Sequence, residues 1–252
     1  MANDLFVELQ EKLEGKKVRI VFPEAYDERV LEAAVKLSAT SYVQPVLVGK
    51  RERVEEIAQP LFLNVSGIEF VDHENYEKYD EMVAKFVERR AGKVTEEKAR
   101  ELLQDVNYFG TMLVYMGEVE GLVSGAIHST GDTVRPALQI IKTKPGVSRT
   151  SGAFIMSRNA SRFIFADCAI NTTIDAQGLA EIAVESAKTA KAFNINPKVA
   201  MLSFSTYGSA KTEETLKVAE ATKLVREKAP TLPVGGEMQF DAAISPQVAR
   251  KK

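Results

Sequence analysis

Residues 121–145, GLVSGAIHSTGDTVRPALQIIKTKP, contain the unit from which the whole chain is built. The mostly apolar start, 121–126, predicts a strand, and the small polar residues after it predict a turn that leads into a helix. Proline has no backbone N–H, so we expect Pro136 in the first turn of that helix, with Asp132 or Thr133 as the N-cap. Strand, loop and helix in this order are the repeating unit of α/β proteins.

The same alternation continues on both sides of this segment and predicts the α/β class with parallel strands rather than hairpins. Strands are expected at residues 18–22, 45–48, 68–71, 121–126, 153–156, 163–166, 198–204 and 235–241. Helices are expected at 3–14, 27–39, 51–59, 76–91, 95–105, 109–116, 176–192 and 213–228. The stretch Thr143-Lys144-Pro145-Gly146 has the composition of a linker. We therefore expect a first α/β domain at 1–145 and a second at 146–252.

Composition excludes several classes of function. The 252 residues are 45% hydrophobic and 27% charged, and 33 basic against 35 acidic residues give no overall field that would attract nucleic acid or an anionic membrane. No apolar run is long enough to cross a membrane, and the N-terminus does not resemble a signal peptide. Cys168 is the only cysteine and the two histidines are isolated, so neither a disulfide nor a metal site is expected. These features predict a cytoplasmic protein.

The loop before the helix carries groups suited to binding an anion. The hydroxyls of Ser129 and Thr130, the guanidinium of Arg135 and the free N–H groups of the turn are able to converge on one phosphate. The alternative is an ordinary capped turn with a solvated arginine, and the spacing alone leaves both open.

Two further loops follow predicted strands. Residues 203–209, SFSTYGS, place hydroxyls and a glycine before a helix, and the alternative is a structural turn with a helix cap. Asp167 and Asn171 follow another strand, where short polar side chains line ligand crevices. The chain contains no G-x-S-x-G, G-x-G-x-x-G or G-x-x-x-x-G-K-[ST] motif, which disfavours a hydrolase triad, ATP hydrolysis and simple NAD binding.

Four segments taken together resemble the phosphotransacetylase (phosphate acetyltransferase) family: GAIHSTGDTVRPALQIIKTKPG, ADCAIN at 166–171, SFSTYGSAKTEET at 203–215 and GEMQFDAAI at 236–244. They occur in the same order as in that family, and the resemblance extends over essentially the whole chain, including FVERRAGKVTEEKA at 86–99.

The resemblance implies reversible transfer of an acetyl group between acetyl phosphate and coenzyme A, with coenzyme A as a substrate and with no cofactor or metal. It implies two α/β domains with a cleft between them, similar to isocitrate and isopropylmalate dehydrogenases, and a homodimer. It assigns the catalytic role to Arg135 and coenzyme A binding to Arg89. The remaining substrate-binding positions that it implies are Ser129, Thr130, Gly131, Ser205 and Asn171.

One departure from the family bears on activity. Phosphotransacetylases are expected to continue into an N-D-L-S-R-G-type segment, whose serine and arginine hold the substrate, and to supply a nearby aspartate as the base for the thiol. Neither is found in these 252 residues, so a closing helix of the first domain and part of the second are expected to be missing. The alternatives are a non-catalytic fragment that binds coenzyme or an anion, and a phosphotransbutyrylase. A dehydrogenase of related fold is less favoured, because no dinucleotide loop is present.

Overall fold

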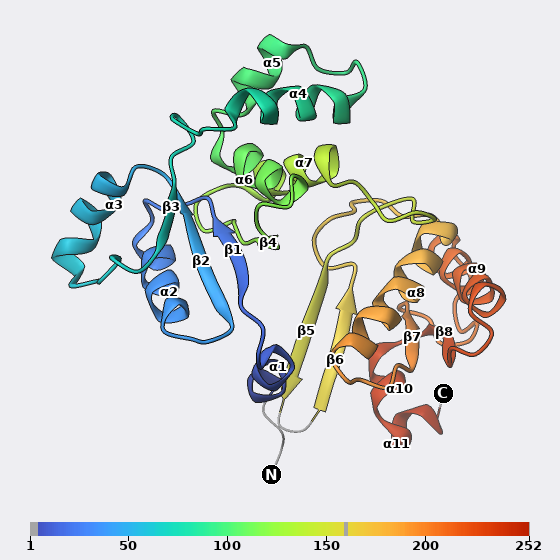
Figure 1. Ribbon diagram of the computed structural model, residues 1–252. Helices are drawn as coiled ribbons and strands as arrows, with labels where there is room; N and C mark the ends of the chain where they lie inside the picture. The colour runs from blue at the N-terminus through green and yellow to red at the C-terminus, as the bar shows by residue number, and fades with distance from the viewer. Residues whose placement is uncertain (1–4, 159–160, 252) are drawn as a thin grey trace. The chain divides into compact units, whose positions relative to one another are not determined.

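The computed structural model describes residues 5–158 and 161–251. The chain divides into two compact units, of which one ends at Lys142 and the other begins at Thr143. Figure 1 shows the elements of both units, and each unit is described by itself below.

The first unit is built on a four-stranded parallel sheet. Its strands are β1 (Val18–Phe22), β2 (Val43–Val48), β3 (Glu69–Val71) and β4 (Gly121–Leu122), in the order β3-β2-β1-β4. Because side chains alternate along a strand, Val21 and Val46 enter one apolar cluster while Phe22 and Leu47 enter another. Both faces of the sheet are therefore covered, as is usual for parallel sheets.

In the described part of this unit, seven α-helices accompany the sheet (Figure 1). They are α1 (Leu5–Leu13), α2 (Glu28–Ser38), α3 (Arg51–Ala58), α4 (Tyr79–Arg90), α5 (Glu96–Leu102), α6 (Val106–Tyr115) and α7 (Thr130–Ile140), with a short 3₁₀ turn at Gln59–Leu61. Side-chain oxygens of Asp27, Thr95 and Asp105 cap α2, α5 and α6 by accepting hydrogen bonds from first-turn N–H groups. The expected helices are thus present, although the part of α1 expected at residues 3 and 4 lies outside the described residues.

Two details of the segment around α7 differ from expectation. Strand β4 ends at Leu122 instead of 126. The Val123 N–H still donates to the Val21 carbonyl of β1, but the N–H groups of Gly125 and Ala126 bind a side chain rather than a neighbouring strand. Helix α7 begins at Thr130 with Ser129 as its N-cap, so the prediction of Asp132 or Thr133 as the cap is wrong. Pro136 consequently lies inside the helix and is buried. One early cap bond and the packing of Pro136 outweigh the backbone hydrogen bond that proline removes.

The described residues of the second unit form two small sheets and four helices. Strands β5 (Ala153–Arg158) and β6 (Ser161–Ala166) pair antiparallel, whereas β7 (Val199–Leu202) and β8 (Val234–Met238) pair parallel. The helices are α8 (Ala176–Ala192), α9 (Glu213–Lys228), α10 (Phe240–Ile244) and α11 (Pro246–Ala249). A third apolar cluster joins α8, α9 and the β7–β8 pair through Ala183, Met201 and Val225.

The second unit corrects two predictions. The expectation of parallel strands throughout is wrong for β5 and β6, which pair directly with each other. The strand expected at 235–241 ends at Met238, and Asp241 lies in α10. The Gln239 N–H donates to the Thr206 hydroxyl at 3.1 Å, which turns the chain away from the sheet at that residue.

One face of the β5–β6 pair is apolar and exposed. The register places Phe154 opposite Phe165 and Met156 opposite Phe163, so all four side chains point to the same face. Each is between 37% and 56% exposed. We call these four residues the aromatic face. Its phenylalanines also line a pocket of about 670 Å³ between β6, α8 and α10.

No helix of the described residues is both long and apolar enough to cross a membrane.

Candidate active site

The loop that follows β4 is held by a buried carboxylate that comes from the end of β1. Both oxygens of Glu24 accept hydrogen bonds from four consecutive backbone N–H groups, those of Gly125, Ala126, Ile127 and His128, at 2.7 to 3.1 Å. The carboxylate also lies 2.6 Å from Nδ1 of His128. The Glu24 side chain is only 1% exposed, so this loop is folded around an internal anion.

The environment of Glu24 keeps it ionised. Burial by itself raises the pKa of the carboxyl group, but the hydrogen bonds from the loop N–H groups and from His128 lower it more, to about 2. Because a carboxylate has only acceptor atoms, it suits a ring of converging donors. Glu24 is therefore a structural anion at every physiological pH.

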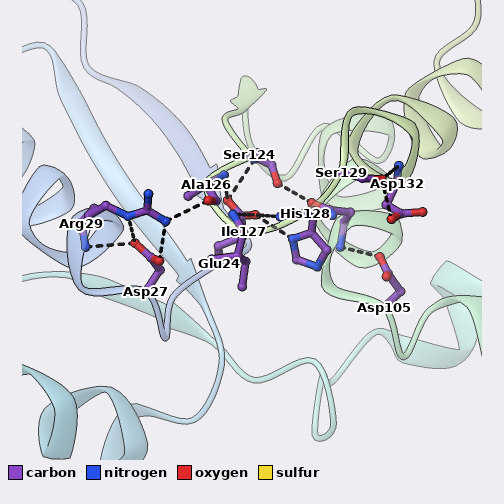
Figure 2. A network of polar contacts seen from close by, with 12 residues as sticks. Glu24, Asp27, Arg29, Asp105, Ser124, Ala126, Ile127, His128, Ser129 and Asp132 are labelled. Atoms are coloured by element: carbon purple, nitrogen blue, oxygen red, sulfur yellow. Dashed lines mark hydrogen bonds and ion pairs between the residues drawn. The ribbon is translucent and has the colours of Figure 1, made fainter.

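Two other contacts fix the same loop. Arg29 forms an ion pair with Asp27 at 2.8 Å and donates to the Ala126 carbonyl, also at 2.8 Å. The Ser124 hydroxyl donates to the amide oxygen of Asn107 at 2.6 Å. Figure 2 shows these contacts arranged around Glu24. The loop thus enters α7 with its backbone held on both sides.

The N-cap and the first two turns of α7 carry the residues predicted from the anion-binding pattern. Ser129 caps the helix, and its hydroxyl donates to Asp132 at 2.7 Å while accepting from the Asp132 N–H. Arg135 lies one turn further along and contacts Asp132 at 3.2 Å, with 57% of its side chain exposed. Thr130 and Gly131 are the first two helical residues, whose N–H groups have no acceptor within the helix.

The donors that remain for a ligand are fewer than the sequence predicted. The N–H groups of residues 125–128 bind Glu24 and are not free. Hydroxyl, guanidinium and N–H donors remain at the start of α7, together with the positive end of its dipole. The Asp132 carboxylate opposes anion binding there, because it already contacts the Ser129 hydroxyl and the Arg135 guanidinium. The hydrogen bond from Ser129 lowers the pKa of the Asp132 carboxyl group, burial raises this pKa, and Arg135 lowers it.

Arg89 belongs to the last turn of α4 and contacts the far end of α7. Its guanidinium donates to the backbone carbonyls of Ile140 and Ile141, the latter at 2.8 Å, and stacks over the ring of Tyr115. The neighbouring Arg90 donates to the Gln139 carbonyl at 3.2 Å. Eleven helical residues span about 16 Å, so Arg89 and Ser129 are not brought together. In this structure Arg89 binds carbonyl groups that the end of α7 leaves unpaired.

The segment from Asp167 to Asn171 in the second unit is a loop held together by its own hydrogen bonds. Asp167 accepts from the N–H groups of Gly152 at 2.8 Å and Asn171 at 2.7 Å, and from the Asn171 side-chain amide at 2.6 Å. That amide also donates to the Thr150 carbonyl. Burial raises the pKa of Asp167, but these hydrogen bonds lower it to about 2. Both amide hydrogens of Asn171 are therefore committed to the protein.

Ser205 is likewise bound internally. It is fully buried, accepts from the Ala210 N–H at 3.0 Å and contacts Glu237 at 3.1 Å. Glu237, which is 5% exposed, also accepts from the Gly208 N–H. Ser205 and Asn171 thus both lie in the second unit, and each is engaged by the loop that carries it.

Sequence reasoning missed Glu24 and gave no role to His128. The signal for Glu24 was a polar, acidic residue shortly after the buried strand 18–22, and Asp167 occupies the equivalent place after the strand 163–166. All three structural carboxylates, Glu24, Asp167 and Glu237, stand at or just beyond the carboxyl end of a strand.

Within the described ranges, no three His, Cys, Asp or Glu side chains are grouped as a metal site requires.

The chain is an α/β protein in which a loop after one strand of a parallel sheet opens a helix amid hydroxyl and guanidinium groups, the place where α/β proteins commonly bind anions. A family model described as phosphate acetyl/butaryl transferase matches residues 4–252. The phosphate acetyltransferase of Bacillus subtilis is 59% identical over 249 residues, which are 99% of this chain and 77% of that protein.

Solved structures give the same result. A phosphotransacetylase from Staphylococcus aureus is 60% identical with a TM-score of 0.91, and the match covers 99% of this chain and 77% of that one. A phosphotransacetylase from Streptococcus pyogenes is 52% identical with a TM-score of 0.93, and the match covers 98% of this chain and 75% of that one. The chain belongs to the phosphotransacetylase family.

Proposed function

We propose that this chain transfers an acetyl group between acetyl phosphate and coenzyme A, giving acetyl-CoA and phosphate, and that phosphate binds at the start of α7. The match to the phosphate acetyltransferase family over residues 4–252 carries the proposal. Ser129, Thr130, Gly131 and Arg135, at the cap and in the first two turns of α7, support the location.

In the proposed reaction, the residues at the start of α7 stabilise the phosphate leaving group. A thiolate attacks the acetyl carbonyl carbon, the bond from that carbon to the bridging oxygen breaks, and phosphate leaves. Arg135 is proposed as the catalytic cation that stabilises the negative charge on the phosphate, with hydroxyl and N–H donors of Ser129, Thr130 and Gly131 completing the site. Phosphate then replaces Asp132 as the partner of Arg135. Arg89, Asn171 and Ser205 are retained as proposed substrate-binding positions, and their internal hydrogen bonds would have to be shared or exchanged.

The remaining proposals concern the assembly. We propose two α/β domains, 1–145 and 146–252, with the substrate cleft between them as in isocitrate and isopropylmalate dehydrogenases. We propose a homodimer in the cytoplasm, without a cofactor or metal and without nucleic-acid or membrane partners. The aromatic face supports self-association, because exposed apolar patches commonly mark protein contacts.

The test is the acetyl phosphate-dependent loss of free coenzyme A thiol, followed with a thiol reagent on the purified chain. Acetyl and butyryl phosphate are compared in parallel, and coenzyme A and acetyl phosphate binding are measured by calorimetry. Faster turnover with acetyl phosphate is the expected result.

The other outcomes separate the alternatives. Faster turnover with butyryl phosphate would identify a phosphotransbutyrylase. Coenzyme A binding without any turnover would identify a binding fragment, and a folded chain that neither binds nor turns over would contradict the proposal.

A further inference from the structure

The loop that follows β7 presents aromatic rings to solvent. The sequence predicts that residues 203–209 offer hydroxyl groups to a ligand, but Ser205 is fully buried and Thr206 is 7% exposed. Phe204 and Tyr207 of the same loop are instead 60% and 64% exposed. Strand β7 pairs in parallel with β8, and loops at the carboxyl ends of parallel strands are where α/β proteins bind ligands. The loop therefore offers a ligand two rings rather than the hydroxyls of Ser205 and Thr206.

Tyr207 adopts a backbone conformation that bulky residues avoid. Its φ is +46°, in the left-handed region where a Cβ atom crowds the backbone. Two hydrogen bonds to Glu237 keep it there. The Tyr207 N–H donates to the Glu237 carbonyl at 2.9 Å, and the Gly208 N–H donates to the Glu237 carboxylate at 2.5 Å. Backbone strain of this kind is concentrated at functional sites, and at Tyr207 it coincides with an exposed ring.

The Tyr207 ring is also held at its hydroxyl end. A Cβ atom on Gly235 of β8 would lie 3.1 Å from the Tyr207 hydroxyl oxygen, so that end of the ring rests against the Gly235 backbone. Because both the loop and the ring are fixed before a ligand arrives, little side-chain entropy is lost when a flat group stacks on the ring. Tyr207 is therefore a preformed stacking surface.

Lys211 adds a positive charge to the same segment. It lies four residues after Tyr207, it is exposed, and it forms no ion pair with a described residue. A flat ring and an unpaired cation suit an adenine nucleotide, because its purine offers a π face and its phosphates are anions. Coenzyme A, the proposed acetyl acceptor, carries such a nucleotide at the end remote from its thiol.

We propose that Tyr207 stacks on the adenine ring of coenzyme A and that Lys211 contacts a phosphate of the same nucleotide, so that this loop favours coenzyme A over shorter thiols. The inference rests on the proposed function. The contact makes and breaks no covalent bond, and the adenine lies far from the reacting sulfur, so the contact acts on binding. Stacking of a base on an aromatic ring is worth about 5- to 150-fold in affinity.

Fluorescence tests the stacking directly. The chain contains no tryptophan, so Tyr207→Trp introduces a single indole at the site. Titration with coenzyme A is expected to quench its emission, whereas pantetheine, which lacks the adenine nucleotide, should leave the emission unchanged. Phe62→Trp is the matched control, because Phe62 also has a positive φ, is 96% exposed and lies in the other unit. Its emission should respond to neither compound.

Binding of coenzyme A by two further variants separates the ring from its backbone. Tyr207→Gly removes the ring and is compatible with the positive φ, so the melting temperature should not fall. Its dissociation constant for coenzyme A in calorimetry is nevertheless expected to rise by about 10-fold. Tyr207→Phe keeps the ring and should bind coenzyme A like the wild type.

The outcomes distinguish this inference from the proposed function. If the wild type transfers acetyl groups but Tyr207→Trp is not quenched by coenzyme A, or Tyr207→Gly binds it like the wild type, the stacking is wrong and the function stands. Quenching by pantetheine as well would also contradict contact with the adenine. Quenching by coenzyme A alone, in a chain without turnover, would support the stacking and contradict acetyl transfer.

Discussion

Glu24 illustrates how one side chain shapes a loop of this chain. Its carboxylate takes the place of a neighbouring strand for residues 125–128, because four backbone N–H groups converge on it. Removing such an acceptor leaves donors unpaired, which costs more than the net value of the hydrogen bonds themselves.

Glu24→Gln should therefore destabilise the protein. One amide oxygen remains as an acceptor, but the new NH2 group faces N–H donors, so the free energy of unfolding should fall by about 3 kcal/mol. Glu32→Gln is the matched control, since Glu32 is an exposed partner of Lys36 and should cost less than about 0.5 kcal/mol. Urea unfolding measures both, and equal stability of the two variants would contradict the role of Glu24.

The acid dependence of stability belongs to the same residue. The pKa of Glu24 is lowered from 4.5 to about 2, so its stabilisation is fully present above pH about 5 and is lost as the pH falls from there toward 2. A shift of this size corresponds to about 3 kcal/mol. The unfolding free energy of the wild type should fall more steeply over this range than that of Glu24→Gln, while Asp167 contributes equally to both. Parallel slopes would show that Glu24 is not the responsible group.

Asp132 and Arg135 should have opposite effects on acetyl phosphate. Asp132 contacts the Arg135 guanidinium at 3.2 Å, so Asp132→Asn removes a competing anion and should lower the KM for acetyl phosphate roughly fivefold. Arg135→Gln removes the cation and should raise the KM by about 10- to 100-fold. Steady-state kinetics at fixed ionic strength measures both, and changes in the same direction would argue against a phosphate site here.

Among the elements, α7 is held at its two ends by different kinds of contact. Ser129 caps its start, and Arg89 and Arg90 bind the carbonyls of its last turn. These contacts stabilise a helix that also contains Pro136, which lacks one backbone donor. The helix that carries the proposed site is thereby anchored independently of any ligand.

Ser129→Ala and Thr95→Ala test whether the α7 cap does more than stabilise. Both hydroxyls accept from a first-turn N–H group, at 3.2 Å in each case, and each loss should cost about 1 kcal/mol. Only Ser129→Ala should also raise the KM for acetyl phosphate, because Thr95 caps α5 instead. Equal unfolding losses with unequal KM values are expected. A KM unchanged in Ser129→Ala would make Ser129 a structural cap alone.

For the molecule as a whole, the aromatic face is the feature that predicts association. Phe154→Asp places a charge on it, and the weight-average mass in sedimentation velocity should fall toward that of a single chain. Phe62→Asp is the control, because Phe62 is 96% exposed and lies in the other unit, outside the aromatic face. Should both variants associate like the wild type, the face does not mediate contact between chains.

Local sequence was sufficient to establish the α/β class, most helices and the family. Helix signals such as Asp27, Thr95 and the 176–192 period are local, so they can be read from neighbouring residues. The hydroxyls and Arg135 at the start of α7 were predicted for the same reason.

The way the loops are held, in contrast, came from tertiary contacts. Glu24 reaches Gly125 across 101 positions of sequence, and Ser205 reaches Glu237 across 32. Such contacts depend on which strands lie side by side, and a local pattern does not contain that information. The start of α7 at Thr130 rests on a local contact, the Ser129 hydroxyl with the Asp132 N–H. Tertiary contacts, in contrast, ended β4 early and tied His128 to a carboxylate, because a backbone N–H group without a strand partner pairs with whichever acceptor the fold brings to it.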